Sequence, residues 1–434
     1  MNSIPPPAPA AVKASRVRFL ILGLLTIGTM INYLDRTVMS VAAPSLSKEL
    51  GLNATDMGWV FSAFGWTYAA AQIPGGILLD RIGVKLTYAL SVTVWSAFTL
   101  LLGFASGLRS LIGLRMGLGV AEAPCFPANS RVLSVWFPQQ ERARASGVYF
   151  VGMYAGLAFL SPLLFWISGT YGWRTLFIAV GAAGILFGWI WLKLYRDPTD
   201  DRGANQAELD HIKAGGGLAP PGPRTKFEWR HIGFLLRQRQ IIGAALGQFA
   251  GNFTLVFFLT WFPTYLATER QMSWIKVGFF ATLPFIAAAV GVLSGGLISD
   301  FLLRRTGSAN IARKLPIVAG LAMASCIVAA NFVKNDALVI TVMSVAFFGQ
   351  GMVNLGWTLL TDVAPKRLIG LAGGVFNFCT NLAGIVTPLV VGWIVAKTGS
   401  FEWALAFISL MALGGICSYV FVVGDVKRVE FENA

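Results

Sequence analysis

Residues 76–85 read Gly-Ile-Leu-Leu-Asp-Arg-Ile-Gly-Val-Lys, and a degenerate copy at residues 296–305 reads Gly-Leu-Ile-Ser-Asp-Phe-Leu-Leu-Arg-Arg. In both copies a long apolar run ends in an aspartate that is followed by basic residues. The copies belong to a longer repeat, in which the residues that recur 220 positions later are Gly58, Gly75, Gly76 and Asp80, and those that recur 227 positions later are Pro138, Gly147, Val148, Trp166 and Ile167. This order predicts two related helical bundles, which is the plan of a secondary transporter with its site between the halves.

The composition indicates an integral membrane protein. Of the 434 residues, 56% are hydrophobic and only 12% are charged, yet the formal net charge is +14. Soluble domains have about a quarter of their residues charged. The composition also excludes a disordered chain, a disulfide scaffold and a collagen-like repeat. The four cysteines have no metal-ligand spacing, and we expect neither a metal nor a cofactor.

Apolar runs of about 20 residues predict twelve transmembrane helices. The predicted fold is therefore an all-α integral membrane protein with two pseudo-symmetric six-helix bundles. The predicted domains are residues 1–195 and 241–434, joined by a cytoplasmic loop over 196–240. The predicted spans are 17–43, 56–79, 86–107, 111–135, 146–169, 174–195, 241–267, 274–301, 314–333, 337–360, 369–395 and 402–423. The pair Pro124 and Pro127 is expected to open the fourth helix just past Glu122.

Basic residues fix the expected orientation. With both termini in the cytoplasm, 24 of the 34 Lys and Arg residues fall on cytoplasmic segments, seven on outer loops and three within spans. This bias obeys the positive-inside rule, so the basic excess does not indicate nucleic-acid binding. Within the central loop, residues 207–213 are expected to form a short surface helix that ends at Gly215–Gly217. The loop is either a simple tether or a regulatory segment.

The repeated aspartate motif resembles the cytoplasmic signature of the major facilitator superfamily. An aspartate at a helix end beside basic residues can form contacts in one gate state that break in the other. A simple turn with positive charges is the alternative. The residues assigned to this gate motif are Gly76, Asp80, Arg81, Gly83, Asp300 and Arg304.

Longer strings resemble the anion:cation symporter family within that superfamily. They are Asn32 to Arg36, Val60 to Tyr68, Ala121 to Arg131, Glu208 to Leu218, Arg304 to Lys314 and Gly373 to Phe378. They are most similar to bacterial proton-coupled transporters of sugar acids such as galactonate, glucarate and galactarate. The resemblance covers essentially the whole chain, and it implies a multi-pass protein of the bacterial inner membrane.

Four charges within spans are expected to form the site, because buried charge in a bilayer is costly. Asp35 and Arg36 lie in the first span, and Arg115 and Glu122 lie seven residues apart on one face of the fourth. We expect the four side chains to meet as a neutral cluster. Protonation of an acid would then free positive charge for a substrate carboxylate. The alternative is a static ion-pair network that only fixes helix packing.

The resemblance assigns roles to some of these residues. Positions that match Asp35 and Glu122 carry protons in the family, and the position of Arg36 contacts substrate. Galactonate-type relatives tend to have glutamine where this chain has Met153, whereas Asn354–Trp357 and Gly384–Pro388 look closer to glucarate-type members. The resemblance therefore implies a sugar acid without saying which one.

The carboxy-terminal half offers amides rather than charges. They form pairs at helical i, i+4 spacing, Gln248 with Asn252, Gln350 with Asn354, and Asn377 with Asn381. Amides suit sugar hydroxyls, and an aromatic face suits the C–H surface of a sugar. The resulting candidate substrate residues are Arg36, Tyr68, Arg115, Gln248, Asn252, Asn354, Trp357 and Asn377; some of the amides are expected to be structural.

These features predict a monomeric symporter that takes up an organic anion with protons by alternating access, in contact with membrane lipid. Open alternatives are another carboxylate as substrate (a hexuronate, tartrate or an aromatic acid) and a drug/proton antiporter, although Ser161–Pro162 replaces the Gly-Pro pair usual in antiporters. An enzyme is not expected, because no nucleophile and base pair, metal motif or P-loop is present. A passive channel does not explain the charge cluster.

Overall fold

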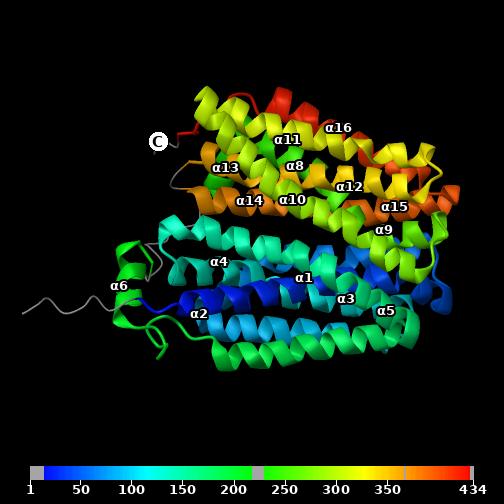
Figure 1. Cartoon of the computed structure of the whole chain (residues 1–434), viewed down its shortest axis with the longest axis horizontal. Coiled ribbons are helices and arrows are strands. Elements are labelled where there is room, and N and C mark those ends of the chain that lie inside the picture. The colour runs from blue at the N-terminus through cyan, green and yellow to red at the C-terminus, as the bar shows by residue number, and fades with distance from the viewer. Residues whose placement is uncertain (1–13, 218–228, 366–367, 431–434) are drawn as a thin grey trace, which may run out of the picture.

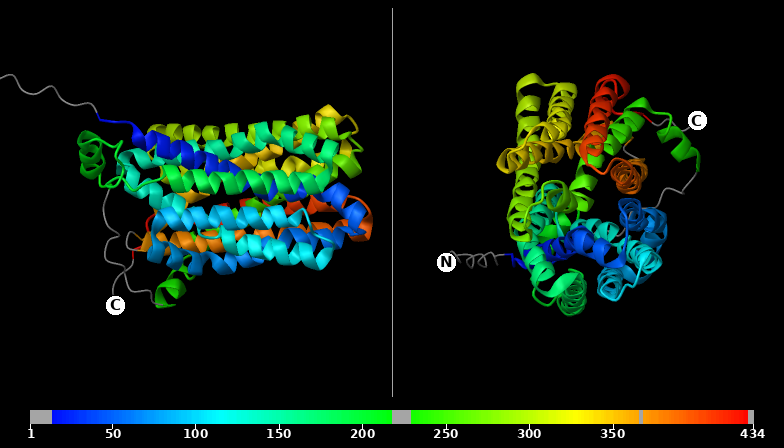
Figure 2. Two further views of the ribbon diagram at one scale, coloured as in Figure 1. Left: turned by 90° about the horizontal axis from the view of Figure 1, so that it is seen from below. Right: turned by 90° about the vertical axis from the view of Figure 1, so that its right-hand side faces the viewer.

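The computed structural model describes residues 14–217, 229–365 and 368–430, and within these ranges the chain is helical without β-strands. Helices of the first half appear in blue to green and those of the second half in green to red, and each group gathers into a bundle of its own (Figure 1). The long axes of the helices run in roughly the same direction in both bundles (Figure 2). The described helices therefore have the arrangement that the sequence repeat predicts.

The amino-terminal bundle contains two very long helices that each make two crossings. Its helices are α1 (Val17–Leu50), α2 (Ala54–Leu102), α3 (Leu108–Glu122), α4 (Cys125–Trp136) and α5 (Gln139–Leu194). Gly83 interrupts α2 with φ 79° and Gly172 interrupts α5 with φ 84°. A straight helix of 56 residues would be about 84 Å long, far more than one bilayer crossing needs. The two glycines therefore separate the second span from the third and the fifth from the sixth.

The carboxy-terminal bundle is built from shorter helices. They are α8 (Arg239–Thr260), α9 (Phe262–Thr264), η1 (Tyr265–Glu269), α10 (Trp274–Thr306), α11 (Ala309–Ser325), η2 (Cys326–Phe332), α12 (Asp336–Val353), α13 (Gly356–Val363), α14 (Ile369–Asn381), α15 (Ala383–Thr398), α16 (Glu402–Cys417) and η4 (Ser418–Val422). Among the described residues of the whole chain, nine helices are long and apolar enough to span a membrane by length and composition. If α2 and α5 are each divided at their internal glycine, and each broken pair such as α3 with α4 is counted as one crossing, the described helices correspond to the twelve predicted segments.

Breaks in three helices lie at mid-length, where candidate site residues are found. The helix that begins at Leu108 stops at Glu122 and restarts at Cys125, which confirms the expected effect of Pro124. In the carboxy-terminal bundle, α12 gives way to α13 around Asn354, and α14 gives way to α15 after Asn381. Breaks of this kind leave backbone N–H and C=O groups inside the protein without their helical hydrogen-bond partners.

Two short helices follow the first bundle in sequence. α6 (Gln206–Ala214) confirms the predicted helix at 207–213, with Gly215 at its carboxyl end. It is not a purely surface helix, because Glu208 and Ile212 are fully buried. A second short helix, α7 (Trp229–Leu235), was not predicted, and the prolines at 220, 221 and 223 lie outside the described residues. α6 lies at the end of the molecule where the described chain begins and ends (Figure 1).

The two bundles contact each other at the end opposite α6. The Phe61 ring on α2 lies 5.2 Å from the Trp261 ring, centroid to centroid. Gly58 is so close to α15 that a Cβ there would lie 2.8 Å from the Pro388 carbonyl oxygen. Gly278 on α10 approaches Phe165 on α5 in the same way. This end of the interface is therefore tightly packed.

Candidate functional site

Arg36 and Glu122 form a buried ion pair inside the amino-terminal bundle. Arg36 Nε donates to Glu122 Oε1 at 2.8 Å, and Nη2 donates to the same oxygen. The Glu122 side chain is fully buried, whereas Arg36 keeps 16% of its side chain accessible. Two charge-assisted hydrogen bonds to one oxygen make this a strong contact. It confirms that α1 and the fourth span bring these two predicted residues together.

Aromatic rings surround the Arg36 guanidinium. Its central carbon lies 5.0 Å from the ring centroids of Tyr33, Phe64 and Tyr68. Phe64 and Tyr68 are one turn apart on α2, and their rings stack at 5.1 Å. Ring faces attract a cation and exclude water, so they strengthen whatever anion contact Arg36 makes. Tyr68 therefore lies where a substrate-contacting residue was predicted.

Asp35 has a different partner from the one predicted. Its Oδ2 accepts a hydrogen bond from Trp95 Nε1 at 2.5 Å, and the carboxyl is 2% exposed. Successive residues on a helix point about 100° apart, so Asp35 turns toward the second half of α2 while Arg36 turns toward Glu122. The indole is a donor only, so it selects an acceptor such as a carboxylate.

Arg115 lies near the other three charges, but its hydrogen bonds go to the backbone. Its Nε and Nη2 donate to the backbone carbonyls of Val60 and Phe61, at 3.2 and 3.1 Å. These carbonyls belong to the turn of α2 that carries the Phe61 contact with Trp261. The predicted pairing is therefore confirmed for Arg36 and Glu122 alone, although Asp35 and Arg115 lie close enough to that pair to interact with it electrostatically. One ion pair is present, and the other two charges bond to an indole and to the backbone, which the span positions alone did not distinguish.

Both acids retain a buried oxygen without a hydrogen-bond partner. These are Glu122 Oε2 and Asp35 Oδ1. Buried polar atoms are normally paired, and exceptions often mark function. Each free oxygen is an atom on which a proton can be added without breaking an existing bond to that atom.

The predicted amides of the carboxy-terminal bundle are partly engaged with one another. Gln248 Nε2 donates weakly to Asn252 Oδ1 at 3.4 Å, and Asn252 Nδ2 donates to the Thr380 carbonyl at 3.1 Å. Asn381 Nδ2 donates to Asn377 Oδ1 at 2.9 Å. The i, i+4 pairing is confirmed for these two pairs, whereas neither polar atom of Gln350 makes a hydrogen bond, so the third pair, Gln350 with Asn354, is not bonded. Asn252 joins α8 to α14, so it has the structural role that was expected for some amides.

Asn354 and Trp357 lie on either side of the helix break in the tenth span. Asn354 Nδ2 approaches the Tyr154 hydroxyl of the other bundle at 3.5 Å. Trp357 is 40% exposed, and the edge of its ring packs against Phe376 at 4.8 Å. Asn354 therefore contacts the amino-terminal bundle, whereas Trp357 has a face available.

The gate motif lies at the end that holds the termini. Gly83 has φ 79° and ψ 170°, a conformation that only glycine adopts readily. Gly76, Asp80 and Arg81 precede it on α2, and Asp80 is exposed. In the second copy, Asp300 contacts Arg313 at 3.9 Å, and Arg313 bonds more closely to Asp362 at 2.8 Å. Arg304 is exposed, so the main basic partner here is Arg313 on the next helix, which the motif alone did not indicate.

Several residues around the candidate site were not predicted from the sequence. Tyr33 and Phe64 could have been found from their i, i+3 spacing to Arg36 and i, i+4 spacing to Tyr68. Trp95 is 60 residues from Asp35 in sequence, and no local pattern relates them. Tyr154 was also not predicted, although it directly follows Met153, and both side chains are buried.

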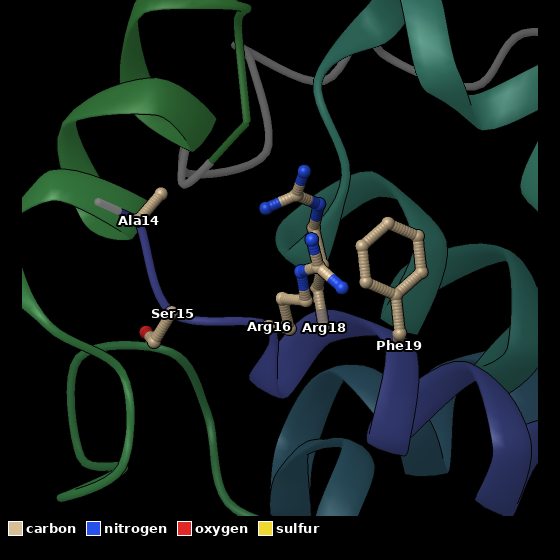
Figure 3. A pocket seen from close by; sticks show the side chains of 5 residues that line it. All are labelled: Ala14, Ser15, Arg16, Arg18 and Phe19. Atoms are coloured by element: carbon tan, nitrogen blue, oxygen red, sulfur yellow. The ribbon is translucent and has the colours of Figure 1, made fainter.

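Two pockets lie away from this site. Figure 3 shows a pocket of about 520 Å³ at the start of α1, lined by Ala14, Ser15, Arg16, Arg18 and Phe19. Arg18 is 18 residues before Arg36 on one helix, which corresponds to about 27 Å. A second pocket of about 260 Å³ lies at the opposite end, between Asn53, Trp261 and Phe401. In the described ranges, no group of three His, Cys, Asp or Glu side chains is arranged to hold a metal.

Comparisons with known proteins agree with this geometry. The Major Facilitator Superfamily sequence profile matches residues 25–388. The chain is 47% identical over 428 residues to the "D-galactonate transporter" of Escherichia coli O6:H1, with 96% of this chain and 98% of that protein covered. It is 42% identical to the "Probable galactarate/D-glucarate transporter GudP" of Escherichia coli K12, with 100% and 99% covered.

More distant relatives share the architecture. The "Hexuronate transporter" of Bacillus subtilis is 30% identical, with 96% of this chain and 99% of that protein covered. A crystal structure of a bacterial homologue of the human lysosomal transporter Spinster, in an inward-facing and occupied conformation, matches with a TM-score of 0.68 at 21% identity. It covers 94% of this chain and 95% of that one. With its repeated helical bundles and a profile match across most of its length, this chain is a multi-pass membrane protein that belongs to the Major Facilitator Superfamily.

Proposed function

We propose that this protein is a symporter that takes up a sugar-acid anion, such as galactonate, glucarate or galactarate, together with protons. The observation that carries the proposal is the buried Arg36–Glu122 pair, with its free carboxylate oxygen and its ring of aromatic side chains. Support for the substrate class comes from the names of the two relatives at 47% and 42% identity. Because the relatives compared are transporters, an enzymatic activity is not part of the proposal.

The ion pair makes proton binding and anion binding mutually dependent. When Glu122 is ionised, it occupies the Arg36 donors that a substrate carboxylate needs. When Glu122 takes a proton, its attraction for Arg36 falls, and the guanidinium accepts the carboxylate of the substrate instead. By linkage, the bound anion then favours the protonated acid to the same degree. Asp35, held by Trp95 in the same bundle, is the second proton carrier of the proposal.

Substrate hydroxyls are assigned to the groups around Arg36 and across the interface. Tyr68 lies against Arg36 and has a hydroxyl, and Asn377, Asn354 and Gln248 offer amides from the other bundle. The exposed face of Trp357 suits the C–H side of a sugar chain. Met153 offers no hydrogen bond at a buried position beside Tyr154, so it favours a substrate whose hydroxyl pattern needs no donor there.

Alternating access is assigned to movement of the two bundles. Residues 1–195 and 241–434 are the proposed moving units, and 196–240 is the proposed link between them. The distribution of Lys and Arg supports a cytoplasmic position for both termini and the link. The proposed setting is the inner membrane of a bacterium, where the chain acts as a monomer. The tightly packed end at Phe61 and Trp261 is the proposed outer gate.

A substrate screen on the purified protein tests the proposal. Thermal shifts and uptake into proteoliposomes are measured over aldonates, aldarates and hexuronates, with and without an inward proton gradient. We expect binding of at least one aldonate or aldarate, and accumulation only when the gradient is present. Binding of hexuronates alone would contradict the proposed substrate class. Accumulation of any screened compound without a proton gradient would contradict proton coupling.

A further inference from the structure

Four side chains form a closed ring of contacts where α6 meets the amino-terminal bundle. Arg18 Nη1 on α1 donates to Glu208 Oε1 on α6 at 3.1 Å, and Arg18 Nε donates to Glu141 Oε2 on α5 at 3.2 Å. Glu141 Oε1 lies 3.0 Å from His211 Nε2, which returns the ring to α6. Glu208 and His211 are three residues apart and so share one face of α6. This charge ring joins three helices that are far apart in sequence.

Backbone contacts hold both ends of α6 in the same place. At its beginning, the Ser15 N–H donates to Oδ1 of Asn205, the residue that caps the helix, at 3.0 Å. At its end, the Gln139 N–H at the start of α5 donates to the Gly215 carbonyl at 2.8 Å. Isolated helices shorter than about 12 residues are marginal in water, and α6 has nine. Its helical structure therefore depends on its docking against α1 and α5.

His211 is the member of the charge ring whose charge changes near neutral pH. An imidazole gains or loses a proton between about pH 5 and 8, whereas carboxylates and guanidinium groups keep their charges over that range. With a neutral His211, the ring holds the charges of Glu208 and Glu141 against that of Arg18 alone. With a protonated His211, positive and negative charges balance.

The contact with Glu141 is suited to the charged imidazole. A carboxylate only accepts, so His211 donates from Nε2 whether the ring is neutral or charged. Addition of a proton at Nδ1 turns this contact into a charge-assisted hydrogen bond, which is stronger. Proton binding by His211 therefore strengthens the attachment of α6 to α5.

Other charges around this contact leave that role to His211. The titratable and charged groups that surround it are Arg16 and Arg18 at the start of α1, Glu141, Arg142 and Arg144 on α5, and Glu208, Asp210 and Lys213 on α6. Arg142 Nη2 donates to the carbonyls of Ser134 and Gly216, both at 2.8 Å. Arg18 divides its donors between two acids. Glu141 thus shares one arginine with Glu208, and His211 completes its pairing.

We infer that the charge ring makes α6 a pH-sensitive clasp, which closes on the amino-terminal bundle when His211 is protonated. The clasp holds the start of α1, the helix that carries Asp35 and Arg36. In the proposed orientation α6 lies on the cytoplasmic side, so protons delivered by the proposed symport would close it. This direction of the signal rests on the proposed function, whereas the pH dependence of docking does not.

Hydrogen exchange of the α6 backbone amides tests the clasp. The purified full-length protein is compared at pH 6 and pH 8 by mass spectrometry. Protection factors, which are corrected for the pH dependence of intrinsic exchange, report how firmly α6 is docked. His211 and Glu141 are 46% and 31% exposed, so the pair contributes modestly. We expect wild-type protection to be about twofold to fivefold higher at pH 6 than at pH 8.

Two variants and a control make the test specific to His211. His211→Gln is neutral at every pH, so its protection should stay at the level of the wild type at pH 8. His211→Arg is always charged, so its protection should be equally high at both pH values. His231→Gln replaces the only other histidine of the sequence and should retain the wild-type difference. Because His211 is half-exposed, these substitutions should not disturb the fold.

The possible results separate this inference from the proposed function. Equal wild-type protection at pH 6 and pH 8, or a difference that persists in His211→Gln, overturns the clasp. Neither result affects the proposed uptake of a sugar acid, because exchange is measured without substrate or gradient. Conversely, uptake that does not depend on a proton gradient contradicts the proposed function and leaves the pH dependence of α6 docking in place.

Discussion

At the residue scale, Arg36 is the group on which the proposed mechanism depends most. It is a partly accessible charge with an acid on one side and three aromatic rings around it. Its planar guanidinium can give up one carboxylate and accept another with the same two donors. A lysine retains the charge but has neither the fork of donors nor the flat face.

Arg36→Lys should therefore weaken substrate binding by at least about tenfold, because charge-assisted hydrogen bonds are worth roughly 1.5–3 kcal/mol. Calorimetry on the purified protein measures this. Asn377→Ala should reduce substrate affinity less, since a neutral amide forms a weaker hydrogen bond than a charged guanidinium. Arg174→Lys, at an exposed pair with Glu49, is the control and should leave affinity unchanged. Equal losses for Arg36→Lys and Asn377→Ala would contradict the assignment of the anion to Arg36.

Trp95 is the residue that controls Asp35. Trp95→Phe removes the indole donor and leaves the ionised carboxylate without its partner, so the proton should be held more tightly. The pH of half-maximal uptake should move up by about one to two units, the equivalent of one charge-assisted bond. Trp191→Phe is the control, because Trp191 is equally buried and its Nε1 has no partner. A midpoint unaffected by Trp95→Phe would show that Asp35 does not release its proton during transport.

At the element scale, the structure depends on a few positions where helices stop or turn. The spans themselves could be predicted from apolar runs, and the break after Glu122 from Pro124, because both signals are local. Arg115 bonding to the carbonyls of Val60 and Phe61 could not be predicted, since it depends on how two helices are rotated against each other. The same holds for the hydrogen bond between Trp95 and Asp35, which no local sequence pattern indicates.

Gly83 is a position where the backbone itself requires glycine. Gly83→Ala should destabilise the protein by roughly 1–3 kcal/mol, because φ 79° with ψ 170° is unfavourable for any side chain. A Cβ at Gly83 would meet no atom within 4 Å, so the whole effect is backbone strain. Gly113→Ala, in the middle of α3 and equally free of contacts, should be neutral or slightly stabilising. Thermal unfolding in detergent measures the stability of both variants. A Gly83→Ala melting temperature equal to that of Gly113→Ala would contradict the proposed backbone strain.

α6 is held to the amino-terminal bundle by Glu208, which is 0% exposed. Its carboxylate accepts from Ser15 Oγ at 2.6 Å, from Arg18 Nη1 at 3.1 Å, and from the first backbone N–H groups of α1. It thus caps a helix far away in sequence.

Glu208→Gln should therefore lower stability by about 3 kcal/mol, as expected when one partner of a buried ion pair is lost. It should also speed proteolysis of the central segment. Asp210→Asn, exposed on the same helix, is the matched control and should do neither. Unaltered proteolysis in Glu208→Gln would show that α6 is only a tether.

At the scale of the whole molecule, charge and contact are distributed unequally between the bundles. The two acids and two arginines of the candidate site are all in the amino-terminal bundle, whereas the predicted substrate residues of the other bundle are amides and a tryptophan. We therefore expect proton coupling and anion binding to depend on the first bundle, and recognition of the hydroxyl pattern to depend on the second.

The most direct test of this account compares wild type and Glu122→Gln in proteoliposomes loaded with the sugar acid that binds best. Two rates are measured for each: accumulation driven by an inward proton gradient, and exchange of labelled for unlabelled substrate without a gradient. The glutamine mimics the protonated acid permanently, so Arg36 stays available to the anion while no proton can be released. We predict that Glu122→Gln loses accumulation and retains exchange, and accumulation equal to that of the wild type would contradict the account.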